Sequence, residues 1–185
     1  MMVLLSMLLG GIASANAPLS KPNFVVILAD DMGWGDLGAY NAASRIPTPR
    51  MDQMARESRR FLDAHSPSGV CTPTRYGLLT GRYSWRGKLK SGVLQGYSPA
   101  LIEPGRPTLA SHLKANGYST CCVGKWHLGL QDGEKTDFAQ PLTPGPLDVG
   151  FDRYFGISAS LDMPPYVFLE NRGLKTPLTG TIGAS

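Results

Sequence analysis

Apolar residues fall into short runs along the chain, and these runs predict strands and helices in alternation. Residues 24–29 form an unbroken apolar, β-branched-rich run, which is typical of a strand buried on both faces in an α/β sheet. Thr48 can cap a helix whose first residue is Pro49, and the spacing of apolar positions predicts that this helix covers about 49–59. A short strand is predicted to follow at 60–64.

The same alternation continues in the middle of the chain. A helix is predicted to begin just after Cys71 and to end at about Thr80, and a second, capped helix is predicted over about 108–115. The next strand is predicted over 118–123. Beyond Gly150, Pro and Gly interrupt every pattern, so no regular element is predicted there. The order strand, helix, strand, helix indicates an α/β fold in which helices flank a sheet.

The first residues of the chain are typical of an export signal. The stretch from Val3 to Ile12 is an apolar run apart from Ser6 but is far shorter than the roughly 18 residues of a membrane span, so we expect no stable membrane insertion. Small residues at alternate positions then predict cleavage after Ala15, or alternatively after Ala17. No Lys or Arg precedes the run, and a buried first strand or helix is the other interpretation. Export predicts a periplasmic or secreted protein.

The composition favours a loop-rich, enzyme-like chain. Of the 185 residues, 42% are apolar and 17% are charged, and there are 22 Gly and 15 Pro, which excludes a coiled coil, a helical bundle and a disordered chain. Positive charge is concentrated in residues 45–90, which carry ten Lys or Arg and three acidic residues. We expect a small anion as partner and no nucleic acid, because no nucleic-acid-binding motif accompanies this charge. A merely solvated basic surface is the alternative.

Two adjacent carboxylates, Asp30 and Asp31, follow the first predicted strand. Neighbouring residues inside a strand point to opposite faces, but at a strand end that runs into Gly33 and Gly35 the backbone can turn both toward one point. Paired carboxylates at the carboxyl end of a strand suit a hard divalent cation such as calcium or magnesium. A turn or helix-capping role is the alternative.

Cys71 is not expected to belong to a disulfide framework, since three cysteines are too few for one, so its presence needs another explanation. It stands at the predicted start of a helix, where backbone N–H groups favour anions and make a thiol reactive. Arg75, one helical turn further on, can reach an oxyanion with two donors. A buried structural cysteine beside a surface arginine is the alternative.

Lys125 and His127 stand two residues apart, so an extended backbone places both side chains on one face. A cation beside an imidazole suits anion binding combined with proton transfer. The alternative is an exposed lysine next to a histidine at the edge of the core. His65 and His112 have no such neighbours, and we interpret them as structural.

These motifs together carry a resemblance to a known family. The sequence C-T-P-T-R at 71–75, followed by L-T-G-R at 79–82, resembles the C-x-P-x-R…L-T-G-R signature of the type I sulfatases. The acids at 30–31 and G-K-W-H-L-G at 124–129 resemble the other N-terminal motifs of that family, in the same order. The segment 155–171 is similar to the arylsulfatase and N-acetylgalactosamine-6-sulfatase branch.

The resemblance, which covers about residues 22–170, implies a role for each matching position. Cys71 would be oxidised by a formylglycine-generating maturation enzyme, and one hydroxyl of the hydrated aldehyde would attack the sulfur of a sulfate ester. Asp30, Asp31 and the modified Cys71 would ligate calcium, or alternatively magnesium. Arg75 would orient the nucleophile. Lys125 and Ser160 would bind the sulfate group, and His127 would assist proton removal from the hydrated aldehyde.

Part of the family's pattern has no counterpart in this sequence. In the type I sulfatases the C-terminal half supplies an Asp-Asn metal pair, a second lysine and a leaving-group histidine, whereas no histidine follows His127 here. The resemblance therefore implies that 22–185 is the N-terminal part of a longer sulfatase domain and is inactive alone. The expected substrate is a sulfate ester, such as a sulfated glycan. The alternatives are a phosphatase or phosphodiesterase of the same fold superfamily and a catalytically dead relative that binds sulfated glycans.

Overall fold

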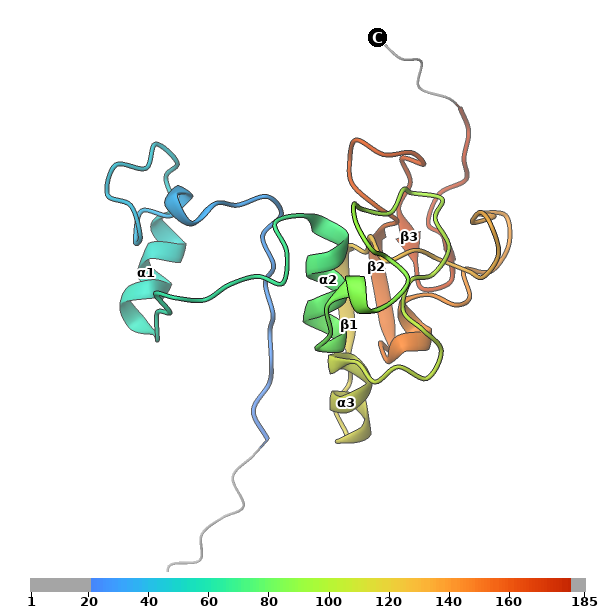
Figure 1. Cartoon of the computed structure of the whole chain (residues 1–185), viewed down its shortest axis with the longest axis horizontal. Helices are drawn as coiled ribbons and strands as arrows, with labels where there is room; N and C mark the ends of the chain where they lie inside the picture. Colours follow the sequence, from blue (N-terminus) through green and yellow to red (C-terminus); the bar gives the residue numbers. More distant parts are fainter. Residues whose placement is uncertain (1–20, 181–185) are drawn as a thin grey trace, which may run out of the picture.

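A computed structural model describes residues 21–180 of the protein (Figure 1). Within this range helices and short strands alternate with long loops. The α-helices are α1 (Pro49–Glu57), α2 (Cys71–Thr80) and α3 (Leu109–Ala115). The 3-10 turns are η1 (Trp34–Asp36), η2 (Ser84–Arg86) and η3 (Pro146–Val149). The strands are β1 (Cys121–Lys125), β2 (Arg153–Ile157), β3 (Leu169–Glu170) and β4 (Gly173–Leu174).

The four strands form one mixed sheet in the order β1-β2-β3-β4. β1 and β2 are parallel, so the chain between them must cross over, and it does so through a long connection that contains η3. β2, β3 and β4 pair antiparallel. Gly124 lies opposite Gly156 in the parallel pair, and a Cβ on Gly156 would come within 1.7 Å of the Gly124 carbonyl oxygen. The close approach of these strands therefore requires glycine.

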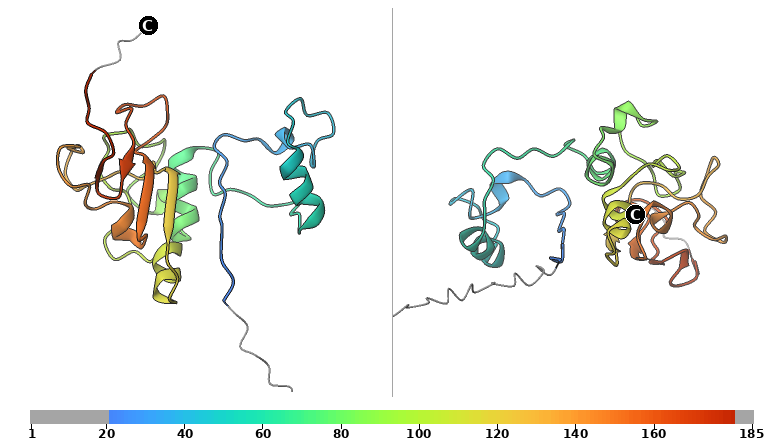
Figure 2. Two further views of the ribbon diagram at one scale, coloured as in Figure 1. Left: turned by 180° about the vertical axis from the view of Figure 1, so that it is seen from behind. Right: turned by 90° about the horizontal axis from the view of Figure 1, so that it is seen from below.

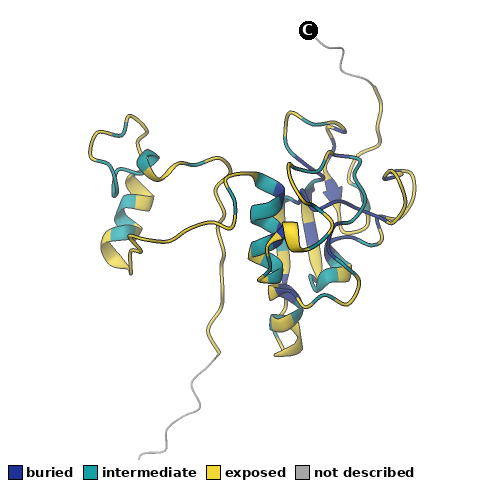
Figure 3. Cartoon of the chain, viewed as in Figure 1, coloured by how far each residue is buried: buried dark blue, intermediate teal, exposed yellow. Residues whose placement is uncertain are grey.

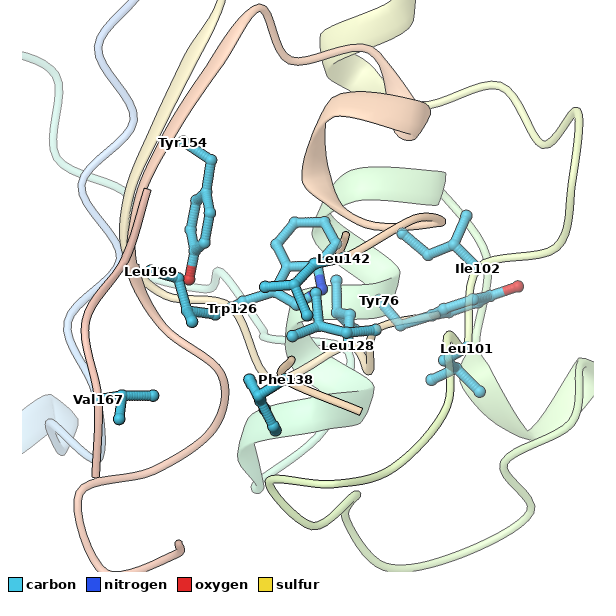
Figure 4. Packing of buried hydrophobic residues seen from close by; sticks show 11 residues of the cluster. Tyr76, Leu101, Ile102, Trp126, Leu128, Phe138, Leu142, Tyr154, Val167 and Leu169 are labelled. Carbon is cyan, nitrogen blue, oxygen red and sulfur yellow. The ribbon is translucent and has the colours of Figure 1, made fainter. Parts of the chain in front are cut away.

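The hydrophobic core lies between one face of this sheet, α2 and the crossover connection (Figure 4). Tyr154 from β2 and Leu169 from β3 reach it from the sheet, and Tyr76 reaches it from α2. The segment after β1 supplies Trp126 and Leu128, which are 3% and 1% exposed. Burial of these large side chains fixes α2 against the carboxyl end of β1.

The opposite face of the sheet has no helix across it among residues 21–180, as the view from behind shows (Figure 2). Val123 on this face is 74% exposed, and the stacked rings of Phe155 and Phe168 are 40% and 54% exposed. The sheet is thus covered on one side only within the described residues.

Residues 32–65, which include η1 and α1, project away from the sheet and are joined to it by extended connections (Figure 1). Residues 21–70 contain no buried side chain (Figure 3). Local contacts hold this part together, such as the hydrogen bonds from the Thr48 hydroxyl and the Ala39 N–H to the Asp52 carboxylate.

The predicted helices are confirmed, with small changes at their ends. α2 begins at Cys71 itself and ends where Gly81 adopts the left-handed conformation at φ 64°, a conformation that glycine reaches without steric cost. Thr108 caps α3 by accepting a hydrogen bond from the Ser111 N–H. α1 begins at Pro49 as expected, but the Thr48 side chain does not cap it and donates to Asp52 instead.

The strand predicted at 24–29 is wrong, although the segment is extended. Its backbone forms no hydrogen bonds to β1 among the described residues, and a hollow of about 300 Å³ lies between the two. Side-chain contacts hold it beside β1 instead, such as Phe24 against the Tyr118 ring and Asp30 against Lys125. Val25 and Ile27 are 83% and 77% exposed, because residues 21–180 cover neither face of the segment.

Three further sequence predictions differ from the structure. The strand predicted at 60–64 is wrong, because none of the strands described within 21–180 offers it a hydrogen-bonding edge and Phe61 and Leu62 are exposed. The strand predicted over 118–123 is shifted, since pairing with β2 carries β1 on to Lys125. The prediction of no regular element after Gly150 is also wrong, because β2 forms there. Its residues alternate between exposed and buried, but a glycine occupies one of the buried positions, so the sequence does not show the alternation.

The predicted export signal at 1–15, with its alternative cleavage after residue 17, lies outside the described residues. Among residues 21–180, none of the helices is long and apolar enough to cross a membrane.

Candidate active site

Polar side chains from four separate segments meet at the carboxyl end of β1. Asp30 comes from the extended segment beside β1, Arg75 from α2, Lys125 from the last position of β1, and Ser160 from the loop after β2. The carboxyl ends of parallel strands are where ligands bind in open α/β sheets. We call Asp30, Asp31, Cys71, Arg75, Lys125, His127 and Ser160 the polar cluster.

Lys125 is the centre of the cluster. Its side chain is only 8% exposed, and its ammonium lies 2.8 Å from an oxygen of Asp30 and donates to the Ser160 hydroxyl at 3.1 Å. The same Asp30 oxygen lies 3.6 Å from the Arg75 guanidinium. A carboxylate is thus held between two cations, and these cations also offer donors to any anion that enters.

Arg75 is anchored as well as charged. Its side chain is 14% exposed, and its Nη1 donates to the backbone oxygen of Lys125 at 2.6 Å. Its buried Nε has no hydrogen-bond partner among residues 21–180. The anchor ties the first turns of α2 to the end of β1 and leaves one guanidinium edge able to donate elsewhere.

The donor set fits a hard divalent cation. Asp30, Asp31 and Cys71 each offer one ligand atom, and these atoms all lie within 4.8 Å of one another. Carboxylate oxygens are the donors that calcium prefers, whereas a thiol is a soft donor, so an oxygen-bearing side chain in place of Cys71 improves the set. Calcium takes about 6–8 oxygens, and these three residues supply part of that number.

His127 is fully buried beside the cluster, with a left-handed backbone at φ 56°. Its Nε2 lies 2.7 Å from the Leu94 carbonyl oxygen, and a carbonyl only accepts, so Nε2 carries the proton. Within the described part of the chain the buried Nδ1 has no hydrogen-bond partner, so it can act as an acceptor. Burial lowers the pKa of His127 below 6.5, and the charges of Lys125 and Arg75 lower it further against the effect of the Leu94 hydrogen bond.

A hollow of about 310 Å³ adjoins the cluster on the uncovered face of the sheet. Asp30, Lys125 and Ser160 border it at one end. Aromatic and aliphatic side chains line the rest, including Phe155 and Phe168. The cluster therefore has open space beside it for the organic part of a ligand.

The structure brings together every residue that the sequence singled out for chemistry and leaves two histidines apart. His65 is exposed and pairs with Asp63, and His112 is exposed on α3. Sequence reasoning missed the link made by Leu94, whose N–H donates to the buried Thr72 hydroxyl while its carbonyl accepts from His127. No sequence signal identifies Leu94, because it acts through its backbone.

The fold defines an α/β protein of the alkaline-phosphatase-like class, with the polar cluster at the carboxyl end of β1. The protein belongs to the sulfatase family, whose profile matches residues 22–180. It is 44% identical over 151 residues to an N-acetylgalactosamine-6-O-sulfatase of Bacteroides thetaiotaomicron, which covers 82% of this chain and 29% of that protein. It is 45% identical to human arylsulfatase G, over 77% of this chain and 25% of the relative.

Solved structures of sulfatases are also similar to this chain. A structure from work on the metabolism of multiple glycosaminoglycans by Bacteroides thetaiotaomicron matches with a TM-score of 0.79 and 44% identity, over 83% of this chain and 32% of that one. The PsFucS1 sulfatase from Pseudoalteromonas sp. matches with a TM-score of 0.55 and 35% identity, over 71% and 25%. The chain thus spans about a third or less of the length of these relatives.

Proposed function

We propose that the complete protein hydrolyses sulfate esters, with residues of the polar cluster forming the sulfate-binding half of its active site. One observation carries this proposal: the ligand atoms of Cys71, Asp30 and Asp31 lie within 4.8 Å of one another, beside the partly buried cations Lys125 and Arg75. Such a site can hold a dianionic group between a metal cation and two protein cations. Membership of the sulfatase family supports the same reaction.

The substrate class that we propose is a sulfated glycan. The similar protein of Bacteroides thetaiotaomicron is named an N-acetylgalactosamine-6-O-sulfatase. Ps i-CgsB, whose crystal structure contains k-i-k-neocarrahexaose, matches this chain with a TM-score of 0.53 and 28% identity over 71% of its residues. The hollow beside Lys125, with its aromatic lining, offers room for a sugar ring.

Each residue of the cluster receives a role from its contacts. Lys125, held by Asp30 and Ser160, donates to the sulfate oxygens. Arg75, fixed to the Lys125 carbonyl oxygen, orients the group at position 71. His127 accepts a proton at Nδ1, because its Nε2 is committed to Leu94. Ser160 completes the sulfate side of the site through its contact with Lys125.

The proposal includes one covalent modification and one bound metal ion. Formylglycine made from Cys71 by a maturation enzyme would supply an oxygen nucleophile, and calcium held by Asp30, Asp31 and that residue would attract negative charge. Asp30 and Asp31 bring the oxygen donors, and Cys71 brings the side chain that is modified. Magnesium is the other hard cation that the acids suit.

The location that we propose is outside the cytoplasm, in a periplasm or secreted. It rests on the apolar run from Val3 to Ile12 and the small residues up to Ala15.

The test of this function compares two esters. The complete protein that the gene encodes, purified from a host with the maturation enzyme, is assayed on an aryl sulfate and on the matching aryl phosphate. Turnover of the sulfate supports the proposal, and turnover of the phosphate alone would favour a phosphatase. A protein that binds a sulfated oligosaccharide but turns over neither ester would be a binding relative.

The proposed role of His127 predicts the acid side of the pH profile. Only neutral imidazole accepts a proton, and burial lowers its pKa, so kcat/KM on a sulfate ester should stay level down to a pH below 6.5 and fall as pH drops further. His127→Gln should lower the rate by about 10²–10⁴-fold and remove this acid limb. His112→Gln, at an exposed position on α3, is the matched control and should change neither. An unchanged acid limb in His127→Gln would rule out the role.

A further inference from the structure

The carboxylate of Glu103 binds groups from three segments of the chain. Its Oε2 accepts from the Tyr76 hydroxyl at 2.7 Å and lies 3.4 Å from Arg106 Nε. Its Oε1 accepts from Arg82 Nη1 at 3.2 Å. Glu103 therefore links α2, the turn after α2 and the loop before α3 at a single point.

Neighbouring groups keep the Glu103 carboxylate ionised and pack closely around it. Burial alone would raise the pKa of Glu103, but the hydrogen bond from Tyr76 and the charge of Arg106 hold it below its usual range. Tyr76 is 1% exposed, and the Glu103 side chain is 25% exposed. A Cβ on Gly87 would lie 3.0 Å from Glu103 Oε1, so the backbone also packs closely against the carboxylate.

The link bears on the polar cluster because of where Tyr76 stands. Tyr76 directly follows Arg75 on α2, and Cys71 is the first residue of the same helix. Rotation of α2 about its axis would therefore move Arg75 and Cys71 together, whereas Tyr76, held at its hydroxyl, prevents that rotation. The Arg75 contact with the Lys125 carbonyl oxygen depends on the same helix orientation.

We infer that Glu103 is a positioning residue, which holds α2 through Tyr76 and Arg82 in the rotation that aims Arg75 and position 71 at the Asp30–Lys125 pair. The inference rests on the proposed function for its activity readout, and it adds to that function a residue with no contact to the polar cluster. The L-T-G-R sequence at 79–82 gains a physical role, because Arg82 binds the same carboxylate that holds Tyr76.

The test uses Glu103→Gln and Tyr76→Phe in the complete protein, singly and together. The glutamine keeps the shape but loses the charge, and its amide offers an N–H to one of the two arginines, while the phenylalanine removes only the hydroxyl. Misplacement of reacting groups lowers kcat, so each single variant should lose roughly tenfold in kcat, with KM on a sulfate ester within about twofold. The kcat of the double variant should be no lower than that of the less active single variant, because both changes break the same link.

Asp148→Asn is the matched control. Asp148 also pairs with an arginine, Arg172, and its side chain is 27% exposed, close to the 25% of Glu103. It lies outside the polar cluster, so its replacement should lower the melting temperature and leave kcat unchanged. A Glu103→Gln protein that only loses thermal stability, as the control does, would overturn the inference.

A crystal structure of Glu103→Gln separates this inference from the proposed function. If α2 depends on Glu103, the Arg75 Nη1 atom should move beyond 3.5 Å from the Lys125 carbonyl oxygen, against 2.6 Å in the parent chain. An unmoved Arg75 would overturn the inference whether or not the parent protein hydrolyses sulfate esters. If Arg75 is displaced in Glu103→Gln but the parent protein has no sulfatase activity, the result would contradict the proposed function alone.

Discussion

Replacement of Cys71 by alanine should abolish sulfate ester hydrolysis by the complete protein and leave its fold intact. If position 71 supplies the nucleophile, the methyl group of alanine offers none, and losses from such replacements are on the order of 10⁴-fold or more. The Cys71 side chain is partly exposed at the first position of α2, so the free energy of unfolding should change by about 1 kcal/mol or less. Initial rates on an aryl sulfate and urea unfolding curves measure the two effects.

The control for this prediction is Cys121→Ala, which removes an exposed cysteine from β1 and should leave the rate unchanged. Mass spectrometry of the peptide that contains position 71 tests the modification itself. In active parent protein this peptide should carry formylglycine. Activity that accompanies an unmodified thiol, or that survives in Cys71→Ala, would contradict the assignment.

Replacement of either acid should weaken the proposed cation site, with different consequences for the two positions. Asp31 forms no ion pair among residues 21–180, so Asp31→Asn changes only the ligand set. Asp30 also pairs with Lys125 and Arg75, so Asp30→Asn disturbs two cations as well. Loss of one charged oxygen donor should lower activity by about 10²-fold or more at limiting calcium, and excess calcium should restore more of it in Asp31→Asn.

Calorimetric titration with calcium measures the same effect without turnover. Both variants should bind calcium more weakly than the parent protein, whereas Asp63→Asn, at an exposed aspartate that pairs with His65, should bind it unchanged. Parent protein that keeps its full activity after exhaustive chelation would show that no metal acts at this site.

Much of the polar cluster can be recognised in the sequence because each residue stands beside a strong local signal. Cys71 and Arg75 begin a helix that Gly81 ends, and this spacing places them one turn apart wherever the helix packs. Lys125 and His127 follow an apolar strand candidate. The spacing of Cys71 and Arg75 involves neighbours in one helix, so the tertiary fold does not alter it. The extended backbone predicted from Lys125 to His127 is wrong, because β1 ends at Lys125 and His127 adopts a left-handed backbone at φ 56°.

The segment 24–29 marks the limit of such reasoning. Its apolar run indicates side chains that favour burial, but not which partner buries them. Within residues 21–180 neither face is covered, and the segment lies beside β1 without pairing. β2 shows the reverse case, because pairing with β1 creates a strand where Gly156 had hidden the alternation. Strand formation depends on a partner's edge, which a local pattern does not contain.

The sequence by itself determined the α/β class, the extents of α2 and α3, and the side chains able to perform chemistry, because helix caps, glycine stops and residue types act over a few neighbours. Only the tertiary structure decided how these side chains meet. Arg75 reaches the Lys125 carbonyl across 50 residues of chain, Leu94 selects the tautomer of His127 across 33, and Glu103 holds Tyr76 across 27. Such contacts depend on how the core packs α2 against the end of β1, and that packing arises from many distant residues acting together.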